Sequence, residues 1–589
     1  MDAISLDGAV GWFHPAASGR GVVIVGAYGY EDLCSRVTLR ELADGLAASG
    51  LPTLRLEPRD TGDADDLAPG ADRIAAWIDD VRRAAGWMRR ETGVSEIALV
   101  GLRIGALIAA QAASDLGDVD RLVLMAPPVN GKAHRRELSI LARLVDGPSG
   151  GVLADGAIEI AGFRLEAATL DTAAAIDLTA LDRRPAREVT IVGEVGSVAV
   201  ERIGTALTGL GARVETLPFA GYARMMCDPT ASEPALDMVA HLVARLSADL
   251  PTTEARRPAI GPARLVGDGW VEERFVFGDG LAGVLTRPEG PGIAGRSAIW
   301  LNSGRNHHIG WARQTVETSR RLARAGVAVL RMDLAGIGDS PAHAHTPPAA
   351  LYHDGGGADV AAALDEMARR GHARPWVMGA CSGAYRAFHS AVEDPRIAGI
   401  VLVNQLCFLW DASYAVHLSA WMRARPHEFE AEAKRAESGE AAATGGLSGL
   451  PWRLAKKLVR VGLDLYRKLA LAGSARRPGP IEAKFRALSA RGCAVSVVIT
   501  EGDKSVSELE LHTGPDGERI AGLPGVEILR LTDSDHSLSP KPARDRLAHH
   551  LVARLAGAEA PTITSSADVR GARRPAPAPD TRRLATRGV

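Results

Sequence analysis

The sequence repeats itself at a nearly constant spacing, and this repeat limits the fold more than any other feature. Segments of the first half match segments of the second half at offsets of 276 to 278 residues. The matching pairs are 46–55 (LAASGLPTLR) with 322–331 (LARAGVAVLR), 61–63 (TGD) with 337–339 (IGD), and 101–105 (GLRIG) with 379–383 (GACSG). Matches that hold nearly one offset over this length indicate a duplicated domain. The chain of 589 residues has room for two α/β domains of roughly 200–250 residues each.

Both halves alternate short apolar runs with amphipathic stretches. In the first half the expected strands are 21–25, 51–56, 96–100 and 122–125, and the expected helices are 40–48 and 77–90. In the second half the expected strands are 297–301, 327–332, 376–378 and 397–403, with helices that end near 324 and 369. Strands that alternate with helices in this way predict mainly parallel sheets covered by helices on both faces. We therefore expect two tandem α/β domains.

The expected domain boundaries follow from changes in composition. The first domain is expected over 1–255 and the second over 256–556, because a stretch rich in proline and arginine, 251–262, separates the repeats. After residue 556 the chain turns to small, polar, proline and arginine residues. Such a composition does not bury enough apolar surface to fold, so we expect 557–589 to be disordered.

The charge balance and the cysteine count exclude several classes of protein. Lys and Arg number 69 and Asp and Glu number 71, and this near balance disfavours binding to nucleic acid. No run of 18 apolar residues is present, so no integral membrane segment is expected. The start of the chain carries acidic residues where a secretory signal is basic. Five cysteines do not form a disulfide framework in a chain of this length, which fits a reducing cytoplasm.

A glycine-rich turn between an expected strand and an expected helix is the first candidate catalytic feature. Residues 379–383 (GACSG) follow the strand 376–378 and precede a helical stretch that begins at Ala384. In a nucleophile elbow, Gly-x-nucleophile-x-Gly, the glycines prevent clashes with the neighbouring strand and helix. This register makes Cys381 the nucleophile. A register shifted by one residue would make Ser382 the nucleophile, and a third alternative is a packing turn of small residues without catalytic function.

A thiol nucleophile needs a base and an acid that orients the base. In this type of fold they follow the nucleophile in the order acid, then histidine. The apolar strand expected at 495–500 leads to Asp503, and His536 follows the next expected strand, 526–531. The order Cys381, Asp503, His536 is therefore met. The alternative acids are Glu501, Asp533 and Asp535.

Acyl transfer also requires hydrogen-bond donors for the oxyanion. The backbone N–H of Ser382, directly after the nucleophile, is the first expected donor. The second is expected from the loop that follows the strand 297–301, with Arg305 as the amide donor. Gly304 lets this backbone approach the substrate closely. Gly304 and Asn306 are therefore expected to contact the substrate.

The same loop carries two adjacent histidines, His307 and His308. Adjacent side chains diverge, and no third ligand is spaced near them in the sequence, whereas a zinc site uses three or four protein ligands. We therefore interpret the pair as part of a polar loop and expect neither a metal ion nor another cofactor.

The first domain keeps the glycine-rich turn but loses the nucleophile. Arg103 stands where Cys381 stands in the second domain, and arginine cannot attack a carbonyl. The loop expected to carry the histidine, 221–232, contains none. We therefore expect this domain to be catalytically inactive. Two roles remain open: a scaffold or dimer-like partner, or a binding site in which the Arg103 guanidinium holds a carboxylate or phosphate.

The span from about residue 22 to residue 555 resembles the α/β-hydrolase superfamily twice over. The second domain is similar to the bacterial cysteine-nucleophile branch typified by dienelactone hydrolases, and more similar to hydrolases associated with exosortase and exopolysaccharide gene clusters. The motifs that carry this resemblance are 306–310 (NHHIG), 331–340 (RMDLAGIGDS), 379–383 (GACSG), 501–503 (EGD) and 535–540 (DHSLSP). The resemblance implies the fold and the triad, and it suggests a sugar O-acyl group in polysaccharide metabolism as substrate.

The first domain is similar to a sister group of these hydrolases. The motifs are 61–63 (TGD), 131–138 (GKAHRREL) and 158–163 (IEIAGF). It departs from that group at Arg103 and at the missing histidine.

Substrate specificity is expected to depend on an insertion, 406–491, which has helical, lid-like sequence. Within it, 451–468 is amphipathic and basic. This segment is either a cap helix with a solvated cationic face or a surface that gathers an anionic or lipid-linked substrate. The preceding stretch, 438–449, is rich in glycine and alanine and is expected to act as a hinge.

These residues predict a hydrolase of acyl esters or thioesters that acts on a small-molecule or carrier-linked substrate. The same triad would serve an acyltransferase if an alcohol rather than water accepted the acyl group. The alternative from another class is a non-catalytic binding or scaffold protein. Whether the chain forms a homo-oligomer is left open by the sequence.

Overall fold

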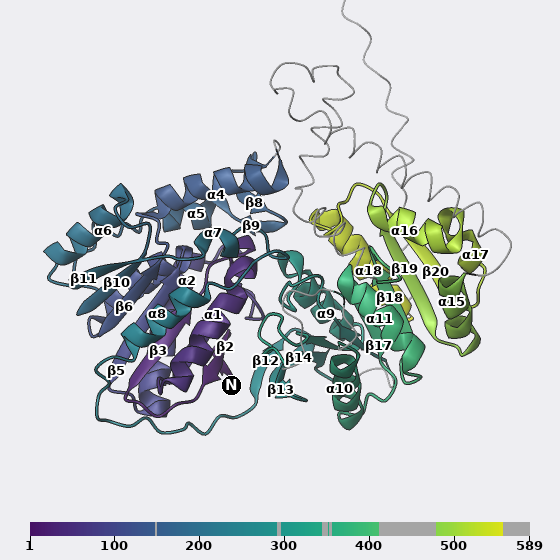
Figure 1. The fold of residues 1–589 in the computed structure, drawn as a ribbon, viewed down its shortest axis with the longest axis horizontal. Helices are drawn as coiled ribbons and strands as arrows, with labels where there is room; N and C mark the ends of the chain where they lie inside the picture. Colours follow the sequence, from purple (N-terminus) through teal and green to yellow (C-terminus); the bar gives the residue numbers. More distant parts are fainter. Residues whose placement is uncertain (148–149, 291–295, 344–351, 353–355, 411–478, 558–589) are drawn as a thin grey trace, which may run out of the picture.

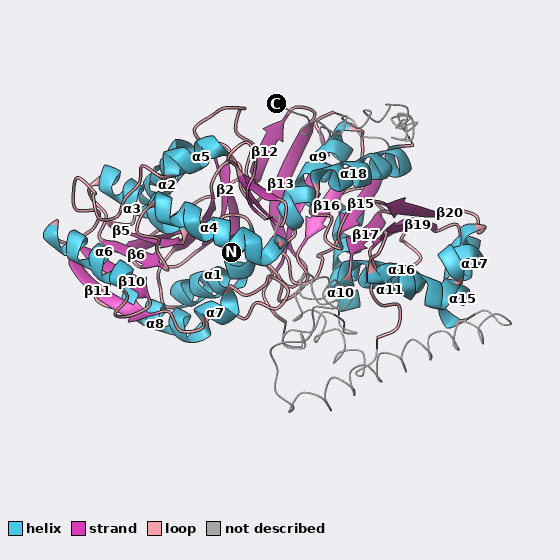
Figure 2. Cartoon of the chain, turned by 90° about the horizontal axis from the view of Figure 1, so that it is seen from above, coloured by secondary structure: helices cyan, strands magenta, loops and turns pink. Residues whose placement is uncertain are grey.

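The structure, a computed structural model, describes residues 1–147, 150–290, 296–343, 352, 356–410 and 479–557. The chain forms two α/β domains that lie side by side (Figure 1). Helices flank the strands of both sheets, as the view from above shows (Figure 2). This confirms the predicted fold class. Most of the predicted lid, at 411–478, and nearly all of the predicted disordered tail, at 558–589, lie outside the described residues.

The first domain has a mixed sheet that is mainly parallel. Its strands are β1 (Asp2–Leu6), β2 (Ala9–His14), β3 (Arg20–Val25), β4 (Thr53–Glu57), β5 (Glu96–Leu102), β6 (Arg121–Met125), β10 (Glu188–Gly193) and β11 (Arg213–Pro218). They lie in the order β1-β2-β4-β3-β5-β6-β10-β11. The neighbours β1, β2 and β4 pair antiparallel, and the pairs from β4 to β11 are parallel. The helices around this sheet are α1 (Tyr30–Ala48), α2 (Arg73–Trp87), α3 (Ile104–Leu116), α6 (Val198–Gly209), α7 (Tyr222–Met225) and α8 (Leu236–Leu246).

The second domain repeats this plan with one additional antiparallel strand. Its strands are β12 (Ala263–Gly267), β13 (Trp270–Phe277), β14 (Leu281–Pro288), β15 (Ser297–Trp300), β16 (Ala328–Met332), β17 (Trp376–Ala380), β18 (Gly399–Val403), β19 (Ala494–Thr500) and β20 (Val526–Leu531). They lie in the order β12-β13-β14-β16-β15-β17-β18-β19-β20. The helices are α9 (Gln314–Arg324), α10 (Gly356–Arg369), α11 (Ser382–Glu393), α15 (Pro480–Ala490), α16 (Lys504–Thr513), α17 (Glu518–Ala521) and α18 (Lys541–Ala556).

Both domains carry an insertion at the same point of the sheet. In the first domain it consists of α4 (Gly131–Asp146), the small sheet β7 (Gly151–Val152), β8 (Ile158–Ile160) and β9 (Phe163–Leu165), and α5 (Ala167–Ala173). In the second domain the residues between β18 and α15 occupy the equivalent position. Phe485 and Leu488 of α15 pack into the core. α15 is therefore a core helix, so the part of the predicted lid that covers 480–490 is wrong.

The antiparallel strands at the start of each sheet differ from the prediction, which contains only the parallel strands. β12 alternates buried and exposed residues, because one face of an antiparallel edge can meet water. Such a strand lacks the continuous apolar run of a central parallel strand. α1 also begins ten residues earlier than expected, at Tyr30. Its first turns carry the buried polar residues Glu31 and Arg36, which interrupt the apolar spacing.

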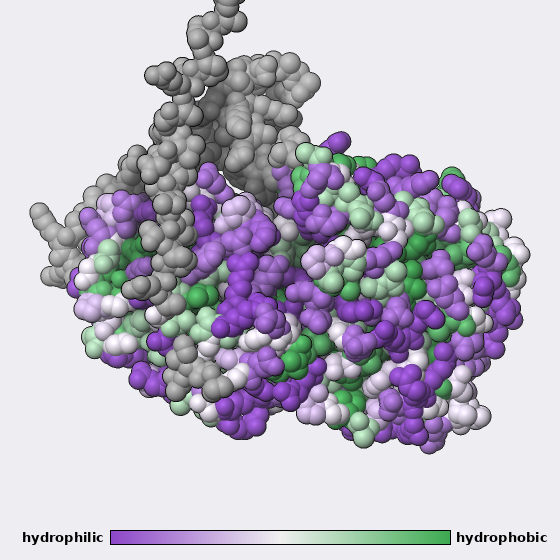
Figure 3. Space-filling model, turned by 180° about the vertical axis from the view of Figure 1, so that it is seen from behind, coloured by the Kyte–Doolittle hydropathy of each residue, from purple (hydrophilic) through white to green (hydrophobic). Residues whose placement is uncertain are grey.

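The core of each domain lies on both faces of its sheet. In β3, Val23 and Val25 pack on one face, and Val22 and Ile24 pack on the other. β15 shows the same alternation in the second domain. A strand that is buried on both faces is expected in a parallel sheet covered by two helix layers. On the surface seen in Figure 3, hydrophilic and apolar residues are interspersed.

Among the described residues, no helix combines the length and the apolar character that crossing a bilayer would need.

The two domains meet through a reciprocal exchange of arginine and aspartate side chains. Arg55 on β4 of the first domain donates to Asp339 of the second domain at 2.6 Å. Arg331 on β16 of the second domain donates to Asp63 of the first domain at 2.9 Å. The two arginines are equivalent positions of the repeat, and so are the two aspartates. The contact is therefore isologous, as in a two-fold symmetric dimer, but it forms within one chain.

Each aspartate is held by a second carboxylate of its own domain. Glu57 accepts the backbone N–H of Asp63 at 2.9 Å, and Asp333 accepts that of Asp339 at 2.9 Å. Glu57 and Asp333 are again equivalent positions of the repeat. Gly338 has φ +52°, and a Cβ at this position would lie 2.3 Å from the Asp333 carboxylate. The close approach of the two acids therefore requires glycine.

Further polar groups surround Asp339, which is fully buried. Arg36 donates to both carboxylate oxygens at 2.7 and 3.0 Å, and the indole N–H of Trp12 donates at 2.7 Å. Burial alone would raise the pKa of Asp339, but Arg36 and Arg55 hold it well below its usual range. Asp339 is therefore ionised, and its charge is paired inside the interface.

Replacing Asp339 with asparagine removes the negative charge that pairs with Arg55 and takes one of its carboxylate partners from Arg36, which keeps Glu57. We expect D339N to lose about 3–5 kcal/mol of unfolding free energy, the usual cost of removing one member of a buried ion pair. Urea denaturation followed by tryptophan fluorescence measures this loss. The control is Asp268→Asn, because Asp268 is fully exposed and only weakly paired with Arg324, and it should leave stability unchanged. A D339N protein as stable as wild type would show that this exchange does not hold the domains.

Candidate active site

Cys381 stands at the apex of the turn that joins β17 to α11. It has φ 53° and ψ −114°, a backbone conformation that non-glycine residues adopt only where their surroundings impose it. A Cβ at Gly379 would lie 2.6 Å from the backbone of Gly383, and a Cβ at Gly383 would lie 2.3 Å from the carbonyl oxygen of Asn302. Both glycines are therefore sterically required.

Ser382, the alternative nucleophile, is the first residue of α11 and is buried. Its hydroxyl accepts a hydrogen bond from the backbone N–H of Gly304 at 3.0 Å. The side chain therefore contacts the loop after β15 instead of standing at the apex of the turn. This geometry favours the register with Cys381 at the nucleophile position.

His536 lies between Asp503 and Cys381. Its Nδ1 is 3.0 Å from Asp503 Oδ2, and it forms a hydrogen bond with the Cys381 thiol. Asp503 follows β19 and caps α16, because its carboxylate accepts the backbone N–H of Ser505 at 2.8 Å. His536 follows β20. The structure thus brings together three residues that are far apart in the sequence.

The pKa of His536 is raised to about 10. Burial alone would lower it, but the hydrogen bonds to Asp503 and Cys381 outweigh this effect. Burial would also raise the pKa of Asp503, whereas its hydrogen bond to His536 brings it below the usual value. At neutral pH the pair therefore consists of an imidazolium and a carboxylate.

The alternative acids lie elsewhere. Glu501, Asp533 and Asp535 are exposed. The Asp535 carboxylate accepts the backbone N–H of Ser539 at 2.8 Å, so it stabilises the loop that carries His536.

Asn404, directly after β18, supports the histidine loop. Its Nδ2 donates to Thr500 Oγ1 at 3.0 Å and to the His536 carbonyl at 2.9 Å. Its Oδ1 accepts the backbone N–H of Thr500 at 2.8 Å. Asn404 therefore joins the ends of two strands to the backbone of His536. The sequence does not reveal this role, because asparagine after a strand is also a common turn residue.

An aromatic cluster borders Cys381. The Tyr352 hydroxyl is 3.7 Å from Cys381 Sγ, and the Tyr352 ring stacks on Trp410 with centroids 4.7 Å apart. Tyr385 meets the same ring edge-on at 5.1 Å. Burial, with a further contribution from Cys381, raises the pKa of Tyr352 well above its usual range. Tyr352 therefore remains a neutral hydroxyl beside the thiol, and it lies in no motif that the sequence analysis uses.

Asn302 organises the loop 302–310. Its Nδ2 donates to the Asn306 carbonyl at 2.8 Å and to Asp333 Oδ1 at 2.7 Å. Its Oδ1 accepts the backbone N–H of Leu334 at 2.7 Å. One buried amide thus fixes the loop to the end of β16.

Gly304, Arg305 and Asn306, the loop residues predicted to act on substrate, lie in three different surroundings. The Gly304 amide reaches the turn that carries Cys381, through Ser382. The Arg305 side chain leads away and donates to the Ser232 carbonyl of the first domain at 3.1 Å. Asn306 is 1% exposed. Because Asn306 is buried, it is better placed to stabilise the conformation of the loop than to contact substrate.

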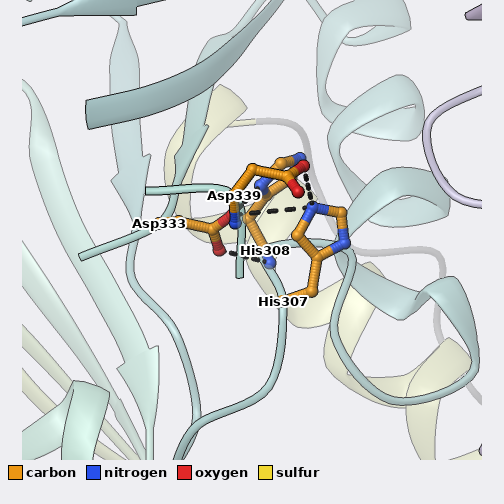
Figure 4. Close-up of side chains that lie close together, drawn as sticks. All are labelled: His307, His308, Asp333 and Asp339. Carbon is orange, nitrogen blue, oxygen red and sulfur yellow. Dashed lines mark hydrogen bonds and ion pairs between the residues drawn. The ribbon is translucent and has the colours of Figure 1, made fainter. Parts of the chain in front are cut away.

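His307 and His308 lie in a buried cluster with Asp333 and Asp339 (Figure 4). His308 Nδ1 is 2.8 Å from Asp333 Oδ2, and its Nε2 is 2.6 Å from Asp63 Oδ2 of the first domain. His307 Nε2 is 3.0 Å from Asp339 Oδ2. The interpretation as an ordinary polar loop is therefore wrong, because the fold brings distant carboxylates to both histidines.

This cluster has the side chains of a metal site, but its charges are already paired. Arg36 donates to Asp339, and its Nη2 lies 3.4 Å from His307 Nε2. Burial alone would lower the pKa of His308, but Asp63 and Asp333 raise it to about 10. Arg36 and Arg55 together donate to both carboxylate oxygens of Asp339, so its charge is paired by guanidinium groups of the first domain. The cluster fits an ion-pair network better than a metal site.

Arg103 has the same position and backbone in the first domain as Cys381 in the second, with φ 57° and ψ −118°. Its guanidinium donates to Glu31 at 2.7 Å and to Glu137 at 2.6 Å. Burial would lower the pKa of Arg103, but Glu31 and other neighbours raise it above its usual value. Two carboxylates thus neutralise the guanidinium. This pairing disfavours the predicted binding of a carboxylate or phosphate and favours the scaffold role.

A cavity of about 60 Å³ lies in the first domain, away from Cys381. Its walls include the turn 26–29 and Ile104 of the first domain, together with Ile309 and Arg313 of the second domain. The space is far smaller than an ordinary ligand pocket of roughly 300–1,000 Å³.

A family model described as serine aminopeptidase, S33, matches residues 294–433, which span β15 to β18 and the turn that carries Cys381. No curated protein matches the chain.

Several solved structures of esterases are distantly similar to this chain. Est1E from Butyrivibrio proteoclasticus, solved with ferulic acid bound, is 16% identical, with 41% of this chain and 96% of that chain covered and a TM-score of 0.31. An esterase from an Arctic intertidal metagenomic library is 16% identical, with 50% and 97% covered and a TM-score of 0.26. The Pyrococcus furiosus esterase Pf2001 is 15% identical, with 50% and 96% covered and a TM-score of 0.30. Likenesses this distant say nothing about substrate.

The raised pKa of His308 predicts how stability depends on pH. His308 keeps its proton in the folded chain up to about pH 10 and loses it near pH 6.5 when unfolded. Its contribution is therefore complete below pH 6.5 and is lost as the pH rises from 6.5 to 10. We expect the unfolding free energy of wild type to fall over this range relative to His308→Gln, as measured by urea denaturation.

The control for this measurement is His241→Gln, because His241 is exposed on α8 of the first domain. Its unfolding free energy should follow that of wild type at each pH. Parallel curves for wild type and His308→Gln would contradict a charged His308 in the folded chain.

If Arg36 and Arg55 supply the positive charge at Asp339, chelation will not weaken the protein. We expect the Tm to be the same before and after dialysis against EDTA, and unchanged by excess zinc. Differential scanning fluorimetry measures the Tm, and elemental analysis measures metal in the purified protein. Stoichiometric metal together with a lower Tm after chelation would contradict the ion-pair description.

Proposed function

We propose that this chain, whose second domain is an α/β-fold hydrolase, cleaves carboxylic esters or thioesters with Cys381, His536 and Asp503. The observation that carries the proposal is the constrained apex position of Cys381 beside a histidine that is itself paired with a carboxylate. The matching family is named for a serine enzyme, whereas a cysteine occupies the apex of the turn in this chain. The serine that follows it bonds to the loop 302–310.

In the proposed mechanism His536 deprotonates Cys381 or holds it as a thiolate–imidazolium pair. The thiolate attacks the carbonyl carbon, an S–C bond forms, and the carbonyl electron pair moves to oxygen. When the tetrahedral intermediate collapses, the bond to the leaving group breaks and His536 donates its proton to that group. Asp503 keeps the imidazole oriented through Nδ1.

In the second half of the reaction, neutral His536 takes a proton from water as the water attacks the acyl-enzyme. The S–C bond then breaks, the acid leaves, and the thiolate–imidazolium pair returns. An alcohol in place of water would make the same chain an acyltransferase. The resemblance to hydrolases of exopolysaccharide gene clusters makes small sugar O-acyl esters and carrier-linked acyl groups the first substrates to assay.

The oxyanion that forms in both steps needs donors that are already in place. The backbone N–H of Ser382 is at the start of α11, where helix amides have no partner within the helix. The loop 302–310 supplies the second donor. The Arg305 amide is the expected one, because the Gly304 N–H already donates to the Ser382 hydroxyl.

We also propose that the first domain does not catalyse acyl transfer. Arg103 occupies its apex position and is neutralised by Glu31 and Glu137. A free thiol nucleophile requires a reducing compartment, and all five cysteines of the chain are unpaired. This supports a cytoplasmic location for the protein.

Brief exposure to an activated acyl ester or acyl thioester tests the mechanism by intact-mass spectrometry. We expect an acyl adduct on wild type, none at this site in Cys381→Ala, and formation slowed by roughly 10²–10⁴-fold in His536→Ala. Decay of the adduct with and without added alcohols or sugars separates hydrolase from acyltransferase.

The matched control is Cys227→Ala, because Cys227 is exposed and outside the site; it should acylate like wild type. Labelling of Cys381→Ala at Ser382 would replace the thiol mechanism by a serine mechanism. No adduct on wild type with any acyl donor would favour a binding or scaffold protein.

A further inference from the structure

We propose that the first domain positions the loop 302–310 of the second domain, and that Asp63 is the positioning residue that acts through His308. This inference rests on the proposed function, because it concerns the loop that would donate to the oxyanion. The first domain, which we propose not to catalyse the reaction, then helps to position the active site of the second domain.

The loop is held on one side by its own domain. His308 donates its backbone N–H to Asp333 Oδ1 at 2.8 Å, and its Nδ1 is 2.8 Å from Asp333 Oδ2. The Thr315 hydroxyl donates to the His308 carbonyl. His308 thus fixes the second half of the loop, as Asn302 fixes the first half.

The first domain holds the other side of the same imidazole. His308 Nε2 is 2.6 Å from Asp63 Oδ2. Both side chains are buried, with 3% exposure for His308 and 1% for Asp63. A buried charged hydrogen bond of this length depends on both partners, because either one left alone would be an unpaired charge. The imidazole plane, and with it the backbone of the loop, therefore depends on Asp63.

Asp63 is itself fixed by side chains of the second domain. Arg331 donates to Asp63 Oδ1 at 2.9 Å, and Arg274 lies 3.4 Å from Oδ2. Arg313 and Arg320 donate to backbone carbonyls of the turn that carries Asp63: Arg313 to Gly62 and Ala64, and Arg320 to Asp63 and Ala64. The aspartate therefore acts as a rigid support rather than as an adaptable surface charge.

A second contact from the first domain reaches the loop near its amide donors. Thr230 packs against Gly304, because a Cβ built on Gly304 would lie 3.3 Å from Thr230 Oγ1. Arg305 donates to the Ser232 carbonyl at 3.1 Å. Thr230 and Ser232 belong to the loop 221–232, which lacks the histidine of an active domain. In this structure the loop 221–232 packs against the second domain.

The contacts of Asp63 and Thr230 lie on either side of the loop segment that is expected to donate to the oxyanion. Asp63 holds the loop at His308. Thr230 packs against Gly304, which anchors the loop to Ser382 and directly precedes the expected Arg305 amide donor. Donors to an oxyanion must be held within about 0.5 Å of their working position. A small displacement of the loop would therefore slow formation of the tetrahedral intermediate and leave the thiol itself unchanged.

This difference separates positioning from a merely structural role. Acylation of Cys381 by an activated ester passes through an oxyanion. Alkylation of the same thiol by iodoacetamide is a displacement at a saturated carbon and forms none. A loss of loop geometry lowers the first rate alone, whereas general disruption of the site lowers both. Both rates are read by mass spectrometry on the peptide that contains Cys381.

The test variant is Asp63→Asn in the full-length chain. We expect the acylation rate to fall by at most roughly 10²–10³-fold, the cost of losing one oxyanion donor, and the alkylation rate to stay within about twofold. Asp66→Asn is the matched control, because Asp66 also pairs with Arg313 and Arg320 across the interface but is half exposed and does not touch the loop. It should leave both rates unchanged.

A second variant keeps the proposal testable if Asp63→Asn does not fold. Thr230→Trp adds bulk against Gly304 and removes no buried charge, and it should slow acylation while alkylation is preserved. Its matched control is Thr205→Trp, because Thr205 is exposed on α6.

Wild-type acylation in folded Asp63→Asn would overturn the role of Asp63, and wild-type acylation in Thr230→Trp would overturn positioning by the first domain. If both rates fell equally, the contacts of Asp63 and Thr230 with the loop would support the structure of the site only, without a specific effect on the oxyanion donors. The absence of any acyl adduct on wild type would instead overturn the proposed function.

Discussion

The reciprocal pairing of Arg55 with Asp339 and of Arg331 with Asp63 is the interaction on which the arrangement of this protein depends. Each of these charges is buried, and burying a charge without a partner costs several kcal/mol. Each aspartate pairs with the strand arginine of the other domain instead of the equivalent arginine of its own domain, so each domain supplies the counter-charge that the other needs. These charges can therefore be buried at low cost only when the interface forms. The interface thus differs from a contact between two domains that are each stable alone.

This constraint explains why a domain without a nucleophile is retained. Arg103 stands where Cys381 stands in the second domain and is neutralised by two glutamates. The surface that carries Asp63, however, still pairs with the second domain and reaches the loop next to Cys381. Loss of this domain would expose the charged cluster around His308 and release one side of that loop.

Much of the fold could be predicted from the sequence, and so could the proposal for the chemical core of the site. Alternation of strands and helices and a repeated offset are local or one-dimensional signals, and the elbow around Cys381 has a fixed spacing. The antiparallel strands, the early start of α1 and the buried cluster could not be predicted in this way. Both copies carry an arginine in a buried strand, at Arg55 and Arg331, and this could be seen in the sequence. The partner of each arginine could not be predicted, because it depends on how the two domains face each other.

The sequence by itself determined the duplication, the α/β architecture and the order of the proposed nucleophile, acid and histidine along the chain. These properties depend on local periodicity and on spacing, which a linear pattern contains. Only the tertiary structure decided that His308 joins Asp333 to Asp63, that Ser382 bonds to Gly304, and that Arg103 is already paired. Such contacts join residues tens to hundreds of positions apart, and their existence depends on how the two sheets meet, which no local pattern specifies.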